Sequence, residues 1–193
     1  MTDDRLDALA ERRGVETTVY QPAEDSRLLA AAAIDHARGR TLEVGTGSGW
    51  VAGRIASETD AEVIASDYNP EACRQARERG LPVVRADLVE PFGADSFDTV
   101  AFNPPYLPTD PENEWDDWME RALSGGESGR AVIRPFLDTV GRVLRPDGIV
   151  LLLVSSLTGF ETVVARAEHN GFEVSTVREE SYPFETLSIL RLE

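Results

Sequence analysis

Short apolar runs alternate along the chain with longer segments in which apolar residues recur at helical spacing. The apolar runs predict strands at residues 41–44, 62–66, 82–86, 97–102, 148–155, 173–177 and 186–192. The segments between them predict helices at residues 28–36, 51–58, 70–79, 131–144 and 160–169. Strands and helices that alternate with short connections are typical of a doubly wound α/β sheet. We therefore expect a single α/β domain over residues 1–193, without repeats or linkers.

One connection departs from this pattern, because residues 103–129 show no clear strand or helix signal. A connection of this length inside a compact domain usually serves binding or catalysis. We therefore predict a functional loop here. Its middle is strongly acidic, with Asp110, Glu112, Glu114, Asp116 and Asp117.

The charge balance is strongly acidic, with 35 Asp and Glu residues against 19 basic ones and a formal net charge of −16 at pH 7. Every basic residue is arginine, since the chain contains no lysine. This surface suits a halophilic protein, because a Debye length of about 3 Å at molar salt screens the self-repulsion. The same charge argues against direct nucleic-acid binding, which needs basic patches to replace counterions.

Cysteine and histidine are too few for a zinc site or a disulfide, since the chain has only Cys73, His36 and His169. We expect no metal site, and we expect Cys73 to be a small core residue of a helix. No apolar run approaches the length of a membrane span, and the first residues lack the features of a secretion signal. These observations predict a cytoplasmic protein that does not act at a membrane.

The first predicted strand leads into a glycine-rich turn, Glu43–Gly49, which reads E-V-G-T-G-S-G. Glycines at such a turn let the backbone approach a ligand closely, but the spacing differs from the G-x-G-x-x-G of dinucleotide-binding turns. Carboxylates accompany the turn, with Glu43 inside it and Glu24 and Asp25 in the segment before the first helix. They favour a cationic ligand over a pyrophosphate.

Two further acids, Asp67 and Asp87, end the second and third predicted strands. Asp67 follows Gly45 by 22 residues, where an acid can accept hydrogen bonds from both hydroxyls of a ribose. Asp87 stands where a carboxylate can accept from an adenine amino group. A ribose, an adenine and a positive charge together describe S-adenosylmethionine.

The fourth predicted strand ends at the tetrapeptide Asn103-Pro104-Pro105-Tyr106. Proline fixes φ and has no N–H, and a residue before proline is pushed toward extended geometry, so this loop is stiff. It lies at the carboxyl end of a strand, where open α/β sheets bind ligands. Its side-chain amide, its main-chain carbonyls and its aromatic ring suit a flat, neutral substrate that donates N–H bonds, such as a carboxamide or an exocyclic amine.

Together these residues resemble the class I methyltransferases, and more narrowly the small HemK/PrmC-like glutamine methyltransferases of archaea and eukaryotes that modify class I release factors. The similarity covers nearly the whole chain, and we expect it to leave no room for the N-terminal substrate domain of the bacterial relatives. Leu123 departs from the pattern, since relatives often have Trp there, although Trp115 and Trp118 lie nearby. The matching segments are 19–26, 42–49, 67–71, 87–88, 103–109, 125–130 and 185–188.

The resemblance implies a Rossmann-like fold, with a seven-stranded, mostly parallel sheet that has one antiparallel strand and helices on both faces. It implies that Asn103, Pro104 and Tyr106 are the catalytic residues and that these and Pro105 hold the substrate glutamine of a Gly-Gly-Gln loop. S-adenosyl-L-methionine is the implied cofactor and S-adenosyl-L-homocysteine the product. The implied cofactor site consists of Tyr20, Pro22, Glu24, Ser26, Glu43, Gly45, Gly47, Asp67, Tyr68, Asp87, Leu88 and Asn103.

The resemblance also implies two protein partners, a class I release factor as substrate and a small zinc-ribbon activator subunit. In the family the activator pairs with the third strand, here residues 82–86, and forms a heterodimer with the enzyme. This segment is short, apolar and predicted to be an open edge. We expect the chain to fold only marginally without the activator.

Three other functions remain open from the sequence. An adenine-N6 methyltransferase acting on nucleic acid would use the same kind of pocket, although such enzymes usually need a basic surface. A protein lysine methyltransferase would fit the acidic residues of the long loop. A non-catalytic subunit would share the fold, but we would expect it to have lost Asn103 or Asp67.

Overall fold

The computed structural model of the chain describes residues 19–109 and 118–193. Within these residues, no helix is long and apolar enough to cross a membrane. The elements are, in chain order, α2 (Glu24–His36), β1 (Arg40–Val44), α3 (Trp50–Glu58), β2 (Glu62–Asp67), α4 (Pro70–Glu78), β3 (Val83–Arg85), β4 (Phe97–Phe102), α5 (Trp118–Leu123), α6 (Ile133–Thr139), η1 (Val140–Val143), β5 (Leu144–Ser155), η2 (Ser156–Thr158), α7 (Phe160–His169), β6 (Val174–Ser181) and β7 (Thr186–Leu192).

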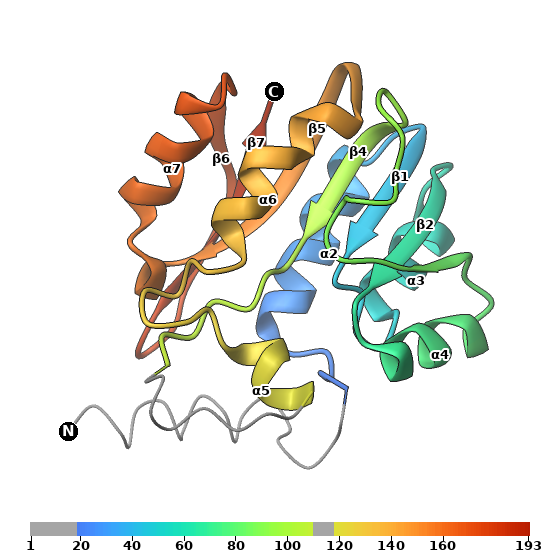
Figure 1. Cartoon of the computed structure of the whole chain (residues 1–193), viewed down its shortest axis with the longest axis horizontal. Helices are drawn as coiled ribbons and strands as arrows, with labels where there is room; N and C mark the ends of the chain where they lie inside the picture. The colour runs from blue at the N-terminus through green and yellow to red at the C-terminus, as the bar shows by residue number, and fades with distance from the viewer. Residues whose placement is uncertain (1–18, 110–117) are drawn as a thin grey trace.

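The described strands form one seven-stranded sheet in the order β3-β2-β1-β4-β5-β7-β6 (Figure 1). The strands from β3 to β5 are parallel to their neighbours, whereas β7 is antiparallel to both β5 and β6. This confirms the expected mostly parallel sheet with one antiparallel strand. The strand order reverses between β1 and β4, which is where doubly wound sheets open a crevice for ligands.

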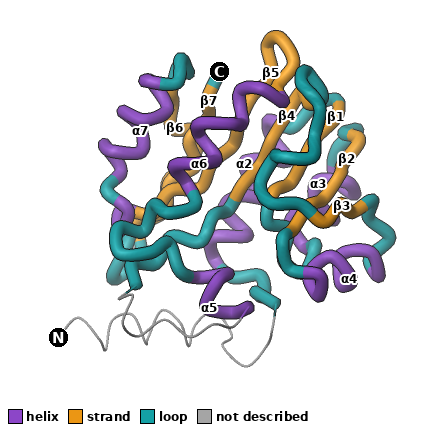
Figure 2. Tube along the Cα trace, in the orientation of Figure 1, coloured by secondary structure: helices purple, strands orange, loops and turns teal. Residues whose placement is uncertain are grey.

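Helices cover both faces of the sheet, with α2 and α3 on one side and α6 and α7 on the other (Figures 1 and 2). β5 shows the two-sided burial most clearly, because successive side chains of a strand point to opposite faces. Leu151 and Leu153 pack in the cluster that contains α2 and α3, and Leu152 and Val154 pack in the cluster that contains α6 and α7. β4 and β5 therefore form the centre of the core.

Three of the helices differ from the prediction by more than one residue. α2 begins at Glu24 rather than at residue 28, so the acidic segment before the expected start is its first turn. The expected helix 131–144 is shorter, because α6 ends at Thr139 and the chain tightens into the 3₁₀ turn η1. Side chains three residues apart eclipse one another in a 3₁₀ helix, and here this buries both Val140 and Val143. The third difference is α5, which lies within the expected loop 103–129.

The strands also differ at their ends. β5 starts at Leu144, and the expected turn at residues 145–148 is an irregularity between its pairs with Phe97 and Thr99. β6 extends to Ser181 instead of ending at residue 177, because pairing with β7 holds a polar segment that has no apolar alternation. β3 is shorter than the predicted strand 82–86.

The turn after β2 forms as predicted. Asn69 caps α4, since its side chain accepts a hydrogen bond of 2.9 Å from the Glu71 N–H, and Pro70 occupies the first helical turn. Cys73 is buried in this helix, as expected for a core residue. Residues 103–109, the cap of α4 and the glycine-rich turn all lie at the carboxyl ends of the parallel strands.

Candidate active site

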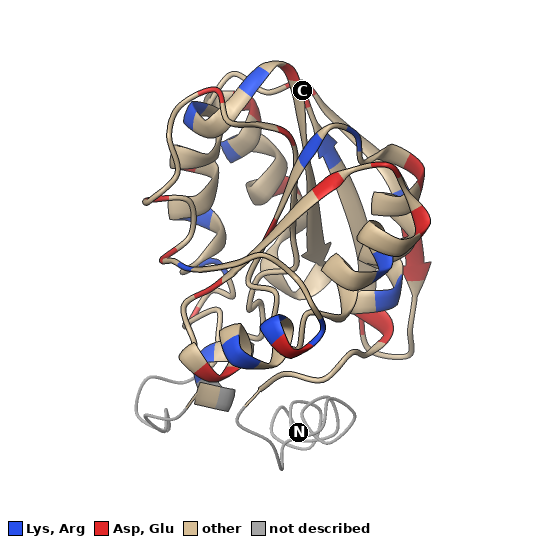
Figure 3. Cartoon of the chain, turned by 90° about the vertical axis from the view of Figure 1, so that its right-hand side faces the viewer, with Lys and Arg blue, Asp and Glu red and all other residues tan. Residues whose placement is uncertain are grey.

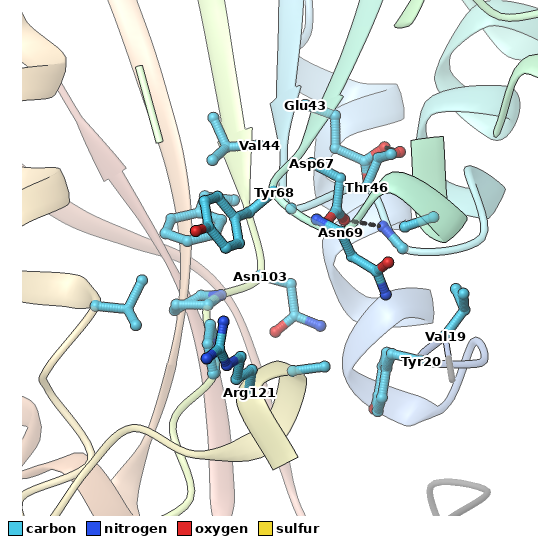
Figure 4. A pocket seen from close by; sticks show the side chains of 18 of the residues that line it. Val19, Tyr20, Glu43, Val44, Thr46, Asp67, Tyr68, Asn69, Asn103 and Arg121 are labelled. Atoms are coloured by element: carbon cyan, nitrogen blue, oxygen red, sulfur yellow. Dashed lines mark hydrogen bonds between the residues drawn. The ribbon is translucent and has the colours of Figure 1, made fainter. Parts of the chain in front are cut away.

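A cavity of about 260 Å³ opens at the carboxyl ends of β1, β2 and β4, at the point where the strand order reverses. Every residue of the expected site except Glu24 lines it. Figure 4 shows side chains from β1, β2 and the segments before α2 and after β4 converging on it. The fold therefore brings together residues that are more than 80 positions apart in the sequence.

The glycine-rich turn forms the floor of this cavity. Gly45 and Gly47 have φ values of 64° and 54°, in the left-handed region that glycine adopts without strain. A Cβ added at Gly45 would lie 3.1 Å from the Phe102 ring, a contact so close that the ring would have to move to admit it. The N–H of Gly47 donates a hydrogen bond of 2.8 Å to Oδ2 of Asp67. The turn is thus tied to the end of β2.

Both carboxylate oxygens of Asp67 accept backbone hydrogen bonds, since Oδ1 accepts from the N–H of Asn69 at 2.8 Å. Burial raises the pKa of Asp67, while these N–H donors act against the rise. Each oxygen retains a further lone pair. Asp67 can therefore accept from two hydroxyls of a ligand in the cavity without giving up its own support.

Glu43 lies deeper, with 3% of its surface exposed. Its Oε2 accepts from the hydroxyl of Thr46 and, at 2.9 Å, from the N–H of Ala52 in the first turn of α3. Burial raises the pKa of Glu43 to about 8, and these two donors oppose the rise. Glu43 thus connects β1, the glycine-rich turn and α3 beneath the cavity.

The start of α2 presents Asp25 to the cavity, while its neighbour Glu24 lies outside the lining. The Asp25 carboxylate accepts from the Tyr20 hydroxyl at 2.7 Å and from the N–H and hydroxyl of Ser26 at 2.6 and 3.2 Å. These bonds place Tyr20 and Ser26 at the edge of the cavity. Pro22 lines it as well.

Asp87 and Leu88 lie at the end of β3 and line the far side of the cavity. Asp87 is exposed, whereas Leu88 is half-buried. Leu88 has a φ of 46°, a left-handed conformation that is uncommon for a residue other than glycine. Strained backbone of this kind tends to occur where a ligand is held.

Asn103 stands at the end of β4 with its side chain in the cavity (Figure 4). Its Oδ1 is buried and has no hydrogen-bond partner among the described residues. A buried acceptor without a partner is costly, so it indicates a group that a ligand satisfies. Pro104 and Tyr106 are buried beside it, and Pro105 is half-buried; all three line the cavity.

α5 supplies a wall that the sequence analysis did not predict, through Trp118, Arg121 and Leu123. The N–H of Leu107 donates to the carbonyl of Leu123 at 3.0 Å, which joins α5 to the segment that follows Tyr106. Trp118 and Arg121 stand three residues apart, a spacing that places both on one face of a helix. That spacing was the available signal for a helix inside the loop.

Comparison with known proteins shows similarity to methyltransferases. Residues 41–125 match the family model described as a methyltransferase domain. A protein of Methanocaldococcus jannaschii with the provisional name protein N5-glutamine methyltransferase is 33% identical over 89% of this chain and 90% of its own length. Human methyltransferase HEMK2 is 33% identical over 93% of this chain and 91% of its length. The Mtq2–Trm112 complex of E. cuniculi contains a chain with a TM-score of 0.76 and 30% identity, covering 92% of this chain and 99% of that one.

A doubly wound sheet with a glycine-rich turn after β1, an acid after β2 and a cavity between them defines a class I S-adenosylmethionine-dependent methyltransferase. The length and identity of the matches allow a narrower statement. The chain belongs to the HEMK2-like family of protein glutamine methyltransferases.

Proposed function

We propose that this enzyme methylates the side-chain amide nitrogen of the glutamine in the Gly-Gly-Gln loop of a class I peptide chain release factor. The buried Oδ1 of Asn103 carries the proposal, because it is an acceptor inside the cavity to which no described residue donates a hydrogen bond. A primary amide supplies the N–H donors that this atom lacks. The related Mtq2–Trm112 complex is responsible for the methylation of the eRF1 translation termination factor, and this supports the same substrate class here.

The proposed cofactor site consists of the cavity's acidic and glycine residues. Bound S-adenosylmethionine supplies a methyl group made electrophilic by a sulfonium. Asp67 would accept from the ribose hydroxyls with the lone pairs that Gly47 and Asn69 leave available. Asp87 and Leu88 would hold the adenine. The remaining members are Tyr20, Pro22, Ser26, Glu43, Gly45, Tyr68 and Asn103, with Asp25 in place of Glu24.

Asn103, Pro104 and Tyr106 would hold the substrate amide. An amide nitrogen is a poor nucleophile because its lone pair is delocalised into the carbonyl. If Asn103 Oδ1 and the Pro104 carbonyl accept its two N–H bonds, the nitrogen is held with its lone pair directed at the methyl group. The same acceptors stabilise the positive charge that develops on nitrogen. Positioning of this kind lowers a barrier by roughly 7–11 kcal/mol.

No general base is needed before the transfer, since the amide proton is lost only after nitrogen has gained the methyl group. The described residues that line the cavity include no histidine, cysteine or lysine, which agrees with such a mechanism. Tyr106 would pack against the flat amide plane. Pro104 and Pro105 would keep the loop rigid so that the acceptors need no reorganisation.

The experiment that tests the proposal is a methyl-transfer assay in high salt with labelled S-adenosylmethionine and an archaeal-type release factor. A paired substrate has the Gln of its Gly-Gly-Gln loop changed to Ala. Label that disappears with this change establishes glutamine methylation. Label that persists contradicts it and indicates lysine or another protein site. Cofactor binding without methyl transfer to either release factor also contradicts it. That outcome would favour a methyltransferase acting on nucleic acid or a non-catalytic subunit.

The charge distribution favours a protein substrate over nucleic acid. On the side that carries α3 and α4, arginine positions along the described ribbon are interspersed with Asp and Glu positions instead of following one another as a basic surface would require (Figure 3). A nucleic-acid enzyme usually needs such a surface to displace counterions. We propose that the protein acts in a cytoplasm of high salt concentration, as the net charge of −16 suggests.

The proposed activator is a small zinc-ribbon subunit that pairs along β3. In the described sheet β3 is an edge strand, hydrogen-bonded to β2 on one side. The carbonyl of Pro82 and the N–H of Ala86 both bond to the β2 side. Backbone groups alternate in direction along a strand, so the N–H of Val83 and of Arg85 point to the open side. They can extend the sheet by one strand from a partner.

Val83→Pro tests this edge, because it removes an outward N–H and leaves the β2 hydrogen bonds intact. We expect it to weaken co-purification with the zinc-ribbon subunit, whereas Val83→Thr retains it. The complex should also have a higher thermal midpoint than the chain alone. Equal midpoints, or unchanged assembly of the proline variant, would count against pairing at β3.

A further inference from the structure

Four side chains form a continuous stack along one side of the cavity, in the order Arg85, Tyr68, Trp118 and Arg121. The Arg85 guanidinium lies 5.8 Å from the centroid of the Tyr68 ring. The Tyr68 and Trp118 centroids are 5.9 Å apart, with a 53° angle between the rings. The Arg121 guanidinium lies 5.5 Å from the Trp118 ring. The stack begins on β3, passes through the turn after β2 and ends on α5.

Tyr68 is the member that most needs support. It follows Asp67 directly and lines the cavity, yet half of its surface is exposed. A ring with this much solvent contact has few neighbours to hold it in one rotamer. Nε of Arg85 donates to the Tyr68 carbonyl at 3.1 Å and so holds the backbone of the turn. The ring itself is held between the Arg85 guanidinium and Trp118.

We propose that Trp118 is a positioning residue that keeps the Tyr68 ring in place at the wall of the proposed cofactor site, next to Asp67. The two rings lie within the separation and tilt at which aromatic pairs attract beyond the burial of their area. Arg121 on the other side of the indole adds a cation–π contact that fixes Trp118 in turn. Trp118 therefore acts on the cofactor through Tyr68. The inference rests on the proposed cofactor site but not on the identity of the methylated substrate.

The arrangement also joins the two halves of the cavity. Tyr68 and Arg85 belong to the side formed by β2 and β3, and α5 follows the loop that contains Asn103. In the view of Figure 4, Asn103 lies between Tyr20 on one side and Tyr68 and Arg121 on the other. The contact between Tyr68 and α5 thus lies on one side of Asn103, where it links the part of the cavity wall formed by β2 and β3 to the part formed by α5.

Titration calorimetry with S-adenosylhomocysteine tests the proposal without any methyl acceptor. We expect Trp118→Ala to weaken binding roughly 3- to 10-fold, the range that the loss of one aromatic pair gives. Trp118→Phe should stay within about 2-fold of the unchanged protein, because it retains a ring opposite Tyr68. Phe184→Ala is the matched control. Besides Tyr68, Phe184 is the large hydrophobic residue that is exposed among the described residues, and it lies outside the cavity lining.

A double-mutant cycle separates positioning from direct contact. If Trp118 acts through Tyr68, the Tyr68→Ala/Trp118→Ala protein binds S-adenosylhomocysteine as weakly as Tyr68→Ala alone. If the fold-losses in affinity of the two single variants multiply in the double variant, Trp118 and Tyr68 contact the ligand independently and the proposal is overturned. Unchanged binding by Trp118→Ala would also overturn it. The thermal midpoint of Trp118→Ala without ligand is expected to match that of the control, and a large drop would instead assign Trp118 a structural role. Because no release factor is present, a failed methylation assay leaves this result unaffected.

Discussion

The backbone N–H of Gly47 donates a 2.8 Å hydrogen bond to the carboxylate of Asp67, so the glycine-rich turn after β1 is held by the residue that ends β2. The two residues are 20 positions apart. This bond explains how one acid both shapes the turn and lines the cavity. The two backbone N–H donors carry no formal charge, so they do not neutralise the Asp67 carboxylate.

Asp67→Asn is expected to weaken both folding and cofactor binding. The amide has one acceptor oxygen, so either Gly47 or Asn69 then faces an NH₂ group instead of an oxygen. Loss of one such bond costs about 1–3 kcal/mol of unfolding free energy. Chemical denaturation and calorimetry with S-adenosylhomocysteine measure the two effects. Asp138→Asn is the control, because Asp138 contacts Arg166 and Asn170 on the surface, outside the cavity lining. It should cost at most about 1 kcal/mol without changing affinity. Equal losses of unfolding free energy and equal affinities in the two variants would refute the role of Asp67.

Asn103→Ala should lower kcat by at least about 10²-fold and leave the affinity for S-adenosylhomocysteine within a few-fold. The physical reason is that the substitution removes the acceptor for the amide N–H bonds but leaves the carboxylates of the cofactor site in place. Single-turnover methylation and calorimetry make the comparison. Asn170→Ala, at a surface contact with Asp138, is expected to retain full activity. Retained turnover in Asn103→Ala would contradict the assignment.

Glu43 makes stability fall as the pH rises through the neutral range. Its pKa is about 8 in the folded protein against an ordinary value of 4.5. Between these values the folded state binds more protons than the unfolded state, so the unfolding free energy decreases with increasing pH. Glu43→Gln keeps an acceptor for Thr46 and Ala52 but cannot titrate. Its unfolding free energy should therefore fall less between pH 5 and pH 8. Denaturant titrations at several pH values measure the unfolding free energy of both proteins. An equal decrease of this free energy with pH in the two proteins would disprove the prediction.

Two glycine substitutions should have opposite effects. Gly49 has a φ of 78°, and a Cβ there would lie 2.8 Å from Cβ and 2.9 Å from Cα of Ala76. Gly49→Ala is therefore expected to destabilise the protein by at least about 1–3 kcal/mol. Gly53 lies inside α3, and a Cβ there would meet no atom within 4 Å. Gly53→Ala should stabilise by about 0.4–1 kcal/mol. Thermal melts of the two variants test the pair, and a shift in the same direction for both would contradict it.

Salt should stabilise the chain. A net charge of −16 makes the folded state repel itself. The Debye length decreases from about 10 Å at 0.1 M salt to about 3 Å at 1 M, which screens most of that repulsion. The thermal midpoint is expected to rise over this interval and to change less above it. A midpoint that falls with added KCl would show that attractive ion pairs outweigh the repulsion.

The elements that the sequence predicted best are those with strong apolar signals. β4, β7 and α7 have the predicted bounds, because their apolar residues follow the strand or helix period without interruption. β6 extended beyond its prediction because its polar second half is held by hydrogen bonds to β7, which no local pattern reveals. α5 was missed because a six-residue helix offers little beyond the single spacing of Trp118 and Arg121, which is too short a signal to establish a helical period.

Local chemistry also indicated most of the cavity, since the glycine-rich turn, Asp67, Asp87 and Asn103 each follow a strand that the apolar pattern had already located. Parallel strands end at one edge of the sheet, so residues at those ends converge whatever the rest of the chain does. The sequence alone therefore determined the fold class, the edge where the site lies and most of its residues.

Only the tertiary structure decided which neighbouring side chains face the cavity and which atoms have no partner. A rotation of about 100° between successive helical residues separates Asp25, which lines the cavity, from Glu24, which does not. Two features depend on packing between segments far apart in the chain: the lack of a donor to Asn103 Oδ1 among the described residues, and the contact between Tyr68 and Trp118. Such contacts follow from three-dimensional geometry, because local patterns carry no information about which distant side chain occupies a given space.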